Sequence, residues 1–333
     1  MPTLTLLAPT TRVPLLADLE ELWRRFDEVA ATLGPEDWSG EHGQHWTFAD
    51  VPYHLAYFDR EVIVTAINRG LTVPTAEPLL RTEAEQDGWK EIQFTPRPAV
   101  TTPEQCLEQL WASRQALRNA VADLGEADLD RPVFLPLVGL GSVSVRLALE
   151  TCCSHTWNHL MQLRFWMKCT TLMPGPAQTQ RALSYFLASF ARNMNREQAT
   201  QTPLTAVMEF SGLDGGVWTL HVAGGSCHLI EGEVACADLV IVQSPETFVK
   251  TRTGIEHPRL ALETGKIQVQ GLRNLATFEK LFPITSLDFA PASRATWDGS
   301  MANRAETNTS QARRARSSAS NGPRAATERG TIE

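Results

Sequence analysis

The sequence lacks the features of a secreted or membrane protein. It contains six cysteines, but no two are spaced as Cys-x-x-Cys, so neither a disulfide framework nor a cysteine-rich metal knuckle is indicated. No run approaches the roughly 18 apolar residues that a membrane helix needs. The first residues show no basic segment followed by a small-residue cleavage site. We therefore expect a cytoplasmic protein with reduced thiols and no membrane span.

Acidic residues outnumber basic residues in this sequence. Lysine and arginine number 30 against 38 aspartates and glutamates, which gives a formal net charge of −8 at pH 7. Proteins that bind nucleic acid normally present a clustered basic face, so we expect no nucleic-acid partner. Hydrophobic residues make up 43% of the 333 residues. That share is enough for well-packed cores, and the length predicts about two domains.

Residues 1–198 have the pattern of an all-α bundle. Leu15, Leu19, Leu22 and Phe26 recur at steps of four and three with charged residues between them, as in an amphipathic helix. Similar patterns predict further helices over 47–67, 103–124, 144–167 and 181–194. Helices of this length joined by loops predict an antiparallel four-helix bundle.

Two of these helices carry recognisable start signals. Thr47 is the expected N-cap of the second helix, since it precedes an apolar periodic segment. Thr102 is the expected N-cap of the third, where Pro103 takes the first helical position and Gln105 completes a capping box.

The pattern changes near residue 200. Short β-branched runs alternate with glycine-rich turns, which predicts strands at 204–211, 216–223, 226–231 and 237–242. Helical patterns follow, so residues 199–287 read as an α+β domain. From residue 288 to 333 the chain has almost no apolar residues and much serine, alanine, arginine and asparagine. This composition predicts a disordered tail.

Three histidines in the helical region could share one ion. His155 and His159 lie four residues apart in HTWNHLMQLR, and side chains at this spacing project to one side of a helix. Two imidazoles so placed can hold a metal ion, although such a pair also occurs among ordinary surface or core histidines. His54 shares its helix face with Val51 and Phe58, so we expect it to point inward. Three neutral ligands with an open coordination position are typical of catalytic metal sites.

The segments WTFADVPYHLA and HTWNHLMQLR resemble the DinB-like four-helix bundle superfamily and the related mycothiol-dependent maleylpyruvate isomerase family. The resemblance spans roughly residues 10–195. It implies a divalent metal, zinc or nickel, held by His54, His155 and His159, and a small-molecule substrate. Bundles of this kind often form homo-oligomers, but the sequence fixes no stoichiometry. The isomerase branch typically has glutamate where this chain has His155, and this departure favours the general three-histidine bundle.

The region from residue 199 to 287 resembles the sterol-carrier-protein type of domain. The segments that carry this resemblance are GGVWTLHVAGGSCHLIEGEVACADLVIVQSPETFVK and ETGKIQVQGLRNLATFEKLF. It implies a sheet covered by helices around an apolar tunnel, and hence an apolar ligand. The isomerase has a similar layout of two modules, so each resemblance supports the other.

Two further residues are candidates for roles beside the metal. Cys152 lies one turn before His155 on the same stripe and could be a fourth ligand, a neighbouring thiol or a core residue. Glu61 follows His54 by seven residues and could orient a ligand or act as a base. An ordinary surface glutamate is the alternative. No residue is assigned a catalytic role from the sequence.

The leading functional expectation is a metal-dependent enzyme. The resemblance implies a low-molecular-weight thiol such as mycothiol, which a bound metal would deprotonate for S-transfer to a small electrophilic metabolite. One alternative is a cis-trans isomerase of the maleylpyruvate type. Another is a non-catalytic carrier that binds metal or lipid. Metal content discriminates the enzyme from the carrier.

Overall fold

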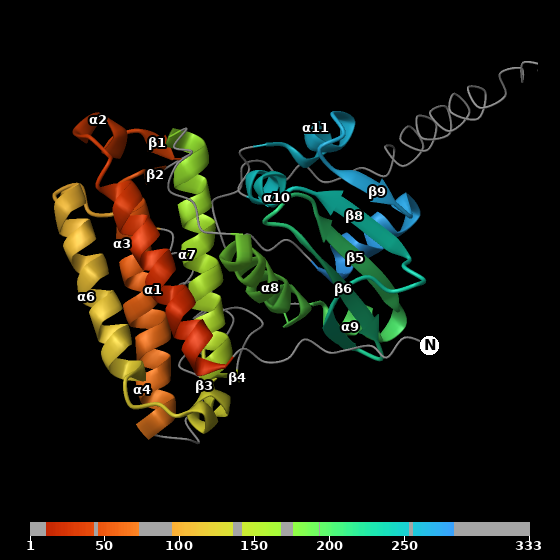
Figure 1. Ribbon diagram of the computed structural model, residues 1–333, viewed down its shortest axis with the longest axis horizontal. Helices are drawn as coiled ribbons and strands as arrows, with labels where there is room; N and C mark the ends of the chain where they lie inside the picture. Colours follow the sequence, from red (N-terminus) through yellow and green to blue (C-terminus); the bar gives the residue numbers. More distant parts are fainter. Residues whose placement is uncertain are drawn as a thin grey trace, which may run out of the picture.

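The computed structural model describes residues 11–42, 46–72, 95–135, 142–167, 176–192, 194–252 and 256–282. The predicted tail at 288–333 lies outside these residues. A helical region and a separate sheet-containing region follow each other along the chain (Figure 1). None of the helices in these ranges is long and apolar enough to cross a membrane.

The helical region has its long helices side by side (Figure 1). Its helices are α1 (Arg12–Ala30), α2 (Pro35–Trp38), α3 (Asp50–Tyr57), η1 (Phe58–Val64), α4 (Thr65–Thr72), α6 (Pro103–Val121), η2 (Glu126–Asp130), α7 (Val145–Met167), α8 (Pro176–Arg192) and α9 (Arg196–Gln201). Its short strands are β1 (Glu41–His42), β2 (Trp46–Thr47), β3 (Pro132–Phe134) and β4 (Ser142–Ser144). The apolar stripe predicted for the first helix is buried in the core.

The predicted capping box of α6 is confirmed. The backbone N–H of Gln105 donates to Thr102 Oγ1 at 3.3 Å, and the N–H of Thr102 donates to Gln105 Oε1 at 2.9 Å. The predicted N-cap at Thr47 is wrong, because α3 begins at Asp50 after Ala49. The N–H and hydroxyl of Thr47 instead donate to Asp50 Oδ2 at 2.6 and 2.9 Å.

Replacing Thr102 by alanine is expected to lower the free energy of unfolding by about 1 kcal/mol, since one helix N–H loses its acceptor. Thr102→Ser keeps the hydroxyl and should stay close to wild type. Chemical denaturation of both variants measures the difference. Equal stabilities for the alanine and serine variants would show that the capping box contributes nothing.

The helix that carries His54 changes its winding one turn after that residue, at Phe58. Residues Phe58–Val64 form a π-helix, η1, between α3 and α4. A π-helix has i→i+5 hydrogen bonds and more residues per turn than an α-helix, and such segments often occur at functional sites. At its start Phe58 and Asp59 are both buried, 3% and 1% exposed.

The sheet region contains β5 (Leu204–Phe210), β6 (Gly216–Ala223), β7 (Ser226–Glu231), β8 (Leu239–Gln243), α10 (Pro245–Arg252), α11 (Pro258–Glu263), β9 (Gln268–Gln270), η3 (Leu272–Asn274) and α12 (Leu275–Leu281). The strand order is β7-β6-β5-β8-β9. β5 and β8 are parallel, and the other neighbours are antiparallel. β5, β6 and β7 follow the predicted bounds within a residue, and β8 begins two residues later than predicted.

The helix α8 lies between the bundle and the sheet (Figure 1) and contacts both α7 and β7. Arg181 donates to the buried carboxylate of Asp18 on α1, Nε to Oδ2 at 2.6 Å. Gln180 Nε2 donates to the Gly215 carbonyl, at the turn before β6, at 2.6 Å. One apolar core therefore runs continuously from the bundle into the sheet region.

Candidate metal centre

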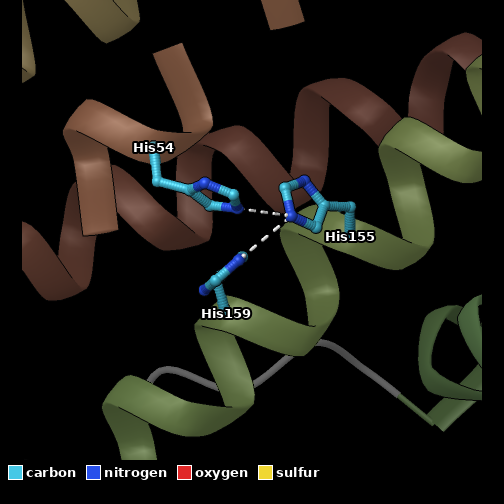
Figure 2. A group of neighbouring side chains, drawn as sticks. All are labelled: His54, His155 and His159. Atoms are coloured by element: carbon cyan, nitrogen blue, oxygen red, sulfur yellow. Dashed lines mark hydrogen bonds between the residues drawn. The ribbon is translucent and has the colours of Figure 1, made fainter. Parts of the chain in front are cut away.

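Two helices bring the three predicted histidines together. His54 projects from α3, and His155 and His159 project from one side of α7. All three side chains point toward one another (Figure 2). Their ligand atoms lie within 4.8 Å of one another, and within the described ranges no other group of histidine, cysteine or acidic side chains meets this condition.

His155 occupies the middle of the triad. Its Nε2 lies 2.9 Å from His54 Nε2 and 3.1 Å from His159 Nε2 (Figure 2). The three rings stand edge to face, with centroids 4.7 to 5.0 Å apart. The same nitrogen of each imidazole thus faces a common point.

The triad is buried and framed by aromatic rings. His54, His155 and His159 are 2%, 9% and 0% exposed. The ring of Phe58 packs on His155 at a centroid distance of 4.1 Å, and Trp46 packs on His54 at 5.0 Å. Burial, together with the charge of His54, holds the pKa of His155 well below its ordinary value. His155 is therefore neutral near pH 7, which is the state in which an imidazole binds metal.

The donor set fits a divalent transition metal. Zinc binds histidine nitrogens at about 2.0–2.1 Å, and neutral imidazoles also suit nickel. Three Nε2 atoms within 4.8 Å of one another need only small side-chain shifts to share one ion. The triad contains no carboxylate, so three neutral groups would leave the ion its full charge.

Cys152 does not belong to this group of ligand atoms. It is fully buried one turn before His155, and its Sγ donates to Asp59 Oδ1 at 3.2 Å. Burial and the neighbouring Asp59 raise the pKa of the Cys152 thiol well above its ordinary value. The thiol is therefore protonated at neutral pH and acts as a hydrogen-bond donor.

The structure does not bring Glu61 to the triad. Its side chain is 40% exposed, and it accepts a hydrogen bond from Arg60 Nε at 2.7 Å. The expected placement assumed an α-helix, in which the seventh residue after His54 returns to the same face. The π-helix has more residues per turn, which breaks that spacing after Phe58.

Asp59 and Trp46 are the neighbours that sequence reasoning missed. Asp59 is surrounded by the core, and burial raises its pKa to about 6, although Arg114 and Cys152 lower it. Phe58 was expected on the face of His54, and its ring packs on His155. Nothing local marked Asp59, since an aspartate between Phe58 and Arg60 has the composition of a surface position.

Comparison with known protein families gives a match in the helical region. Residues 18–163 match the model of the DinB superfamily. The match runs from α1 into α7 and includes all three histidines of the triad. No curated protein matches the sequence.

Several solved structures show weak similarity. Two crystal structures of mycothiol-dependent maleylpyruvate isomerase, one of them a mutant, match with a TM-score of 0.46 at 12% and 13% identity. They cover 74% and 73% of this chain and 91% and 90% of their own. A stereoselective inverting sec-alkylsulfatase from Pseudomonas sp. matches with a TM-score of 0.27 at 10% identity, over 73% of this chain and 33% of its own. These scores are too low to bear on the chemistry of the site.

Proposed function

We propose that this chain is a metal-dependent enzyme that activates a low-molecular-weight thiol, mycothiol or a relative, for S-transfer to a small electrophilic metabolite. The observation that carries the proposal is the convergence of three buried Nε2 atoms from α3 and α7. In this proposal His54, His155 and His159 are the ligands of a zinc or nickel ion. Three neutral ligands leave a coordination position open, as in catalytic sites.

The bound ion would supply Lewis acidity, which lowers the pKa of a thiol and makes it a nucleophile at neutral pH. The chain's own residues hold and shield that centre. The low pKa of His155 keeps its imidazole neutral. The rings of Phe58 and Trp46 cover His155 and His54 and keep water from that side. In S-transfer a carbon–sulfur bond forms, the leaving group departs with its electron pair, and the thiol proton passes to solvent.

A cis-trans isomerase of the maleylpyruvate type is the alternative within the same chemistry. There the thiolate adds to a conjugated cis double bond and is expelled after rotation, so the thiol is regenerated. S-transfer is preferred because His155 stands where the isomerase branch typically has glutamate. The fate of the thiol separates the two reactions.

A non-catalytic carrier with a sterol-carrier-like sheet domain is the alternative from another class. It would need an apolar space between the sheet and its helices. Phe186 of α8 and Phe248 of α10 meet there with ring centroids 5.2 Å apart, and Phe248 lies 5.2 Å from Phe210 of β5. Protein side chains thus occupy the described part of this interior, which favours the enzyme over the carrier.

Thiol binding by the metal-loaded protein tests the proposal. We expect at least one of mycothiol, bacillithiol and glutathione to raise the unfolding temperature of the zinc- or nickel-loaded protein but not of the metal-free protein. With an activated aryl chloride as electrophile, the preferred thiol should be consumed and chloride released. Regeneration of the thiol with isomerisation of a cis-configured conjugated acid would assign the isomerase. Metal-loaded protein that neither binds nor turns over any of the three thiols would contradict the proposal.

A further inference from the structure

A second polar group lies in the bundle core next to the triad. Asp59 of η1 accepts the hydrogen bond from Cys152 of α7, and both side chains are buried. The guanidinium of Arg114 on α6 is 1% exposed and is close enough to Asp59 to lower its pKa. Arg114 Nη1 also donates to Asp27 Oδ1 on α1 at 2.7 Å. The helices α1, η1, α6 and α7 thus each contribute one side chain to this layer of charged and polar groups.

The charges in this layer do not cancel. Among the described residues, Arg114 is the cation placed between the two carboxylates, and its hydrogen bond goes to Asp27. Within the described part of the chain, the hydrogen-bond donor to Asp59 is the Cys152 thiol, which is a weak donor. An ionised carboxylate buried in this way is costly unless another positive charge lies close by. A divalent ion at the neutral triad would be such a charge.

Asp59 is connected to the triad through both helices that carry the ligands. Through Cys152 it contacts α7 one turn before His155, a separation of about 5–6 Å between Cβ atoms. Along η1 it directly follows Phe58, whose ring packs on His155. Both residues lie at the start of the π-helix η1 and are buried.

We propose that Asp59 is a positioning residue of the metal centre. Its carboxylate holds α7 in place through the Cys152 thiol, and its negative charge offsets the charge of the ion at His54, His155 and His159. This inference rests on the proposed metal site. The titratable or charged groups that act on Asp59 are Arg114 from α6 and Cys152 from α7.

The test is the affinity for Zn²⁺, measured by competition with a chromogenic chelator. Asp59→Asn keeps an oxygen that accepts from Cys152 but removes the charge, and we expect it to bind Zn²⁺ about 10- to 100-fold more weakly at pH 7.5. Asp18→Asn is the matched control. It removes another buried carboxylate, which pairs with Arg181 and Tyr185 instead, and should leave the affinity within about twofold of wild type.

The pH profile separates a charge effect from a packing defect. The pKa of Asp59 is about 6, so at pH 5 the wild type must lose a proton from Asp59 to gain its charge. The difference between wild type and Asp59→Asn should therefore shrink about tenfold from pH 7.5 to pH 5.

Several results would overturn the inference. These are an Asp59→Asn affinity equal to wild type at pH 7.5, equal losses in Asp59→Asn and Asp18→Asn, or a ratio that does not change with pH. In each case a wild type that binds Zn²⁺ stoichiometrically would leave the proposed metal site standing. Failure of the wild type itself to bind Zn²⁺ would remove both proposals.

Discussion

Replacing His155 by alanine is expected to abolish stoichiometric binding of zinc or nickel. His155 is the central member of the triad, with its Nε2 within 2.9 and 3.1 Å of those of the other two histidines. Changes to residues that only support metal ligands cost 10- to 100-fold in affinity, so loss of a ligand from a three-histidine set should cost at least about a thousandfold. Elemental analysis of the dialysed protein measures the metal that remains.

Two control variants test whether the loss of metal is specific to a missing ligand at position 155. His155→Glu offers a carboxylate oxygen, another zinc ligand, and should retain metal. His221→Ala removes a histidine of β6 that contacts Thr205 at 3.1 Å, and it should bind metal like wild type. A His155→Ala protein that keeps one ion per chain, or a His221→Ala protein that loses it, would contradict the assignment of the triad.

The sequence predicted those features that depend on local periodicity. His155 and His159 share a side of α7 because i and i+4 positions always do so in an α-helix. The strands β5 to β8 were predictable because short β-branched runs alternate with glycine-rich turns. The capping box at Thr102 needs only three neighbouring residues. In each case the information lies within one turn or one hairpin.

What could not be predicted depends on winding and on distant contacts. Glu61 was expected near His54 from a period of 3.6, and the π-helix breaks that period. Thr47 resembles an N-cap, but its hydroxyl donates to Asp50 instead of accepting from the helix. Asp59 is buried against Cys152, which lies 93 residues away in the sequence and donates a hydrogen bond to it. No local rule anticipates such a contact.

The packing of α8 also could not be predicted fully from the sequence. Its amphipathic pattern predicted a buried face, and the natural partner for that face was the bundle. In the structure α8 contacts α7 and also β6 and β7, and its Phe186 and Phe190 join the aromatic cluster with Phe248. A helical pattern tells which side is buried but not against which element.

Phe248→Ala is expected to lower the free energy of unfolding by about 3–5 kcal/mol, the usual cost of removing a buried phenylalanine ring. Phe248 is 4% exposed. Its ring centroid lies 5.2 Å from those of both Phe186 and Phe210 and 6.5 Å from that of Phe190. It therefore connects α8, α10 and the sheet, and its loss should weaken both regions at once. Chemical denaturation measures the change.

Phe248→Leu is the matched control, because it keeps much of the volume and should cost far less. If the alanine variant lost less than about 1 kcal/mol, the interior between the sheet and its helices would tolerate an empty volume. A space of that kind is what a carrier of apolar ligands needs. A large loss in the alanine variant, with a small one in the leucine variant, means that the phenylalanine rings fill this interior as part of the core, and the sheet region then serves to support α8 and the metal-bearing bundle.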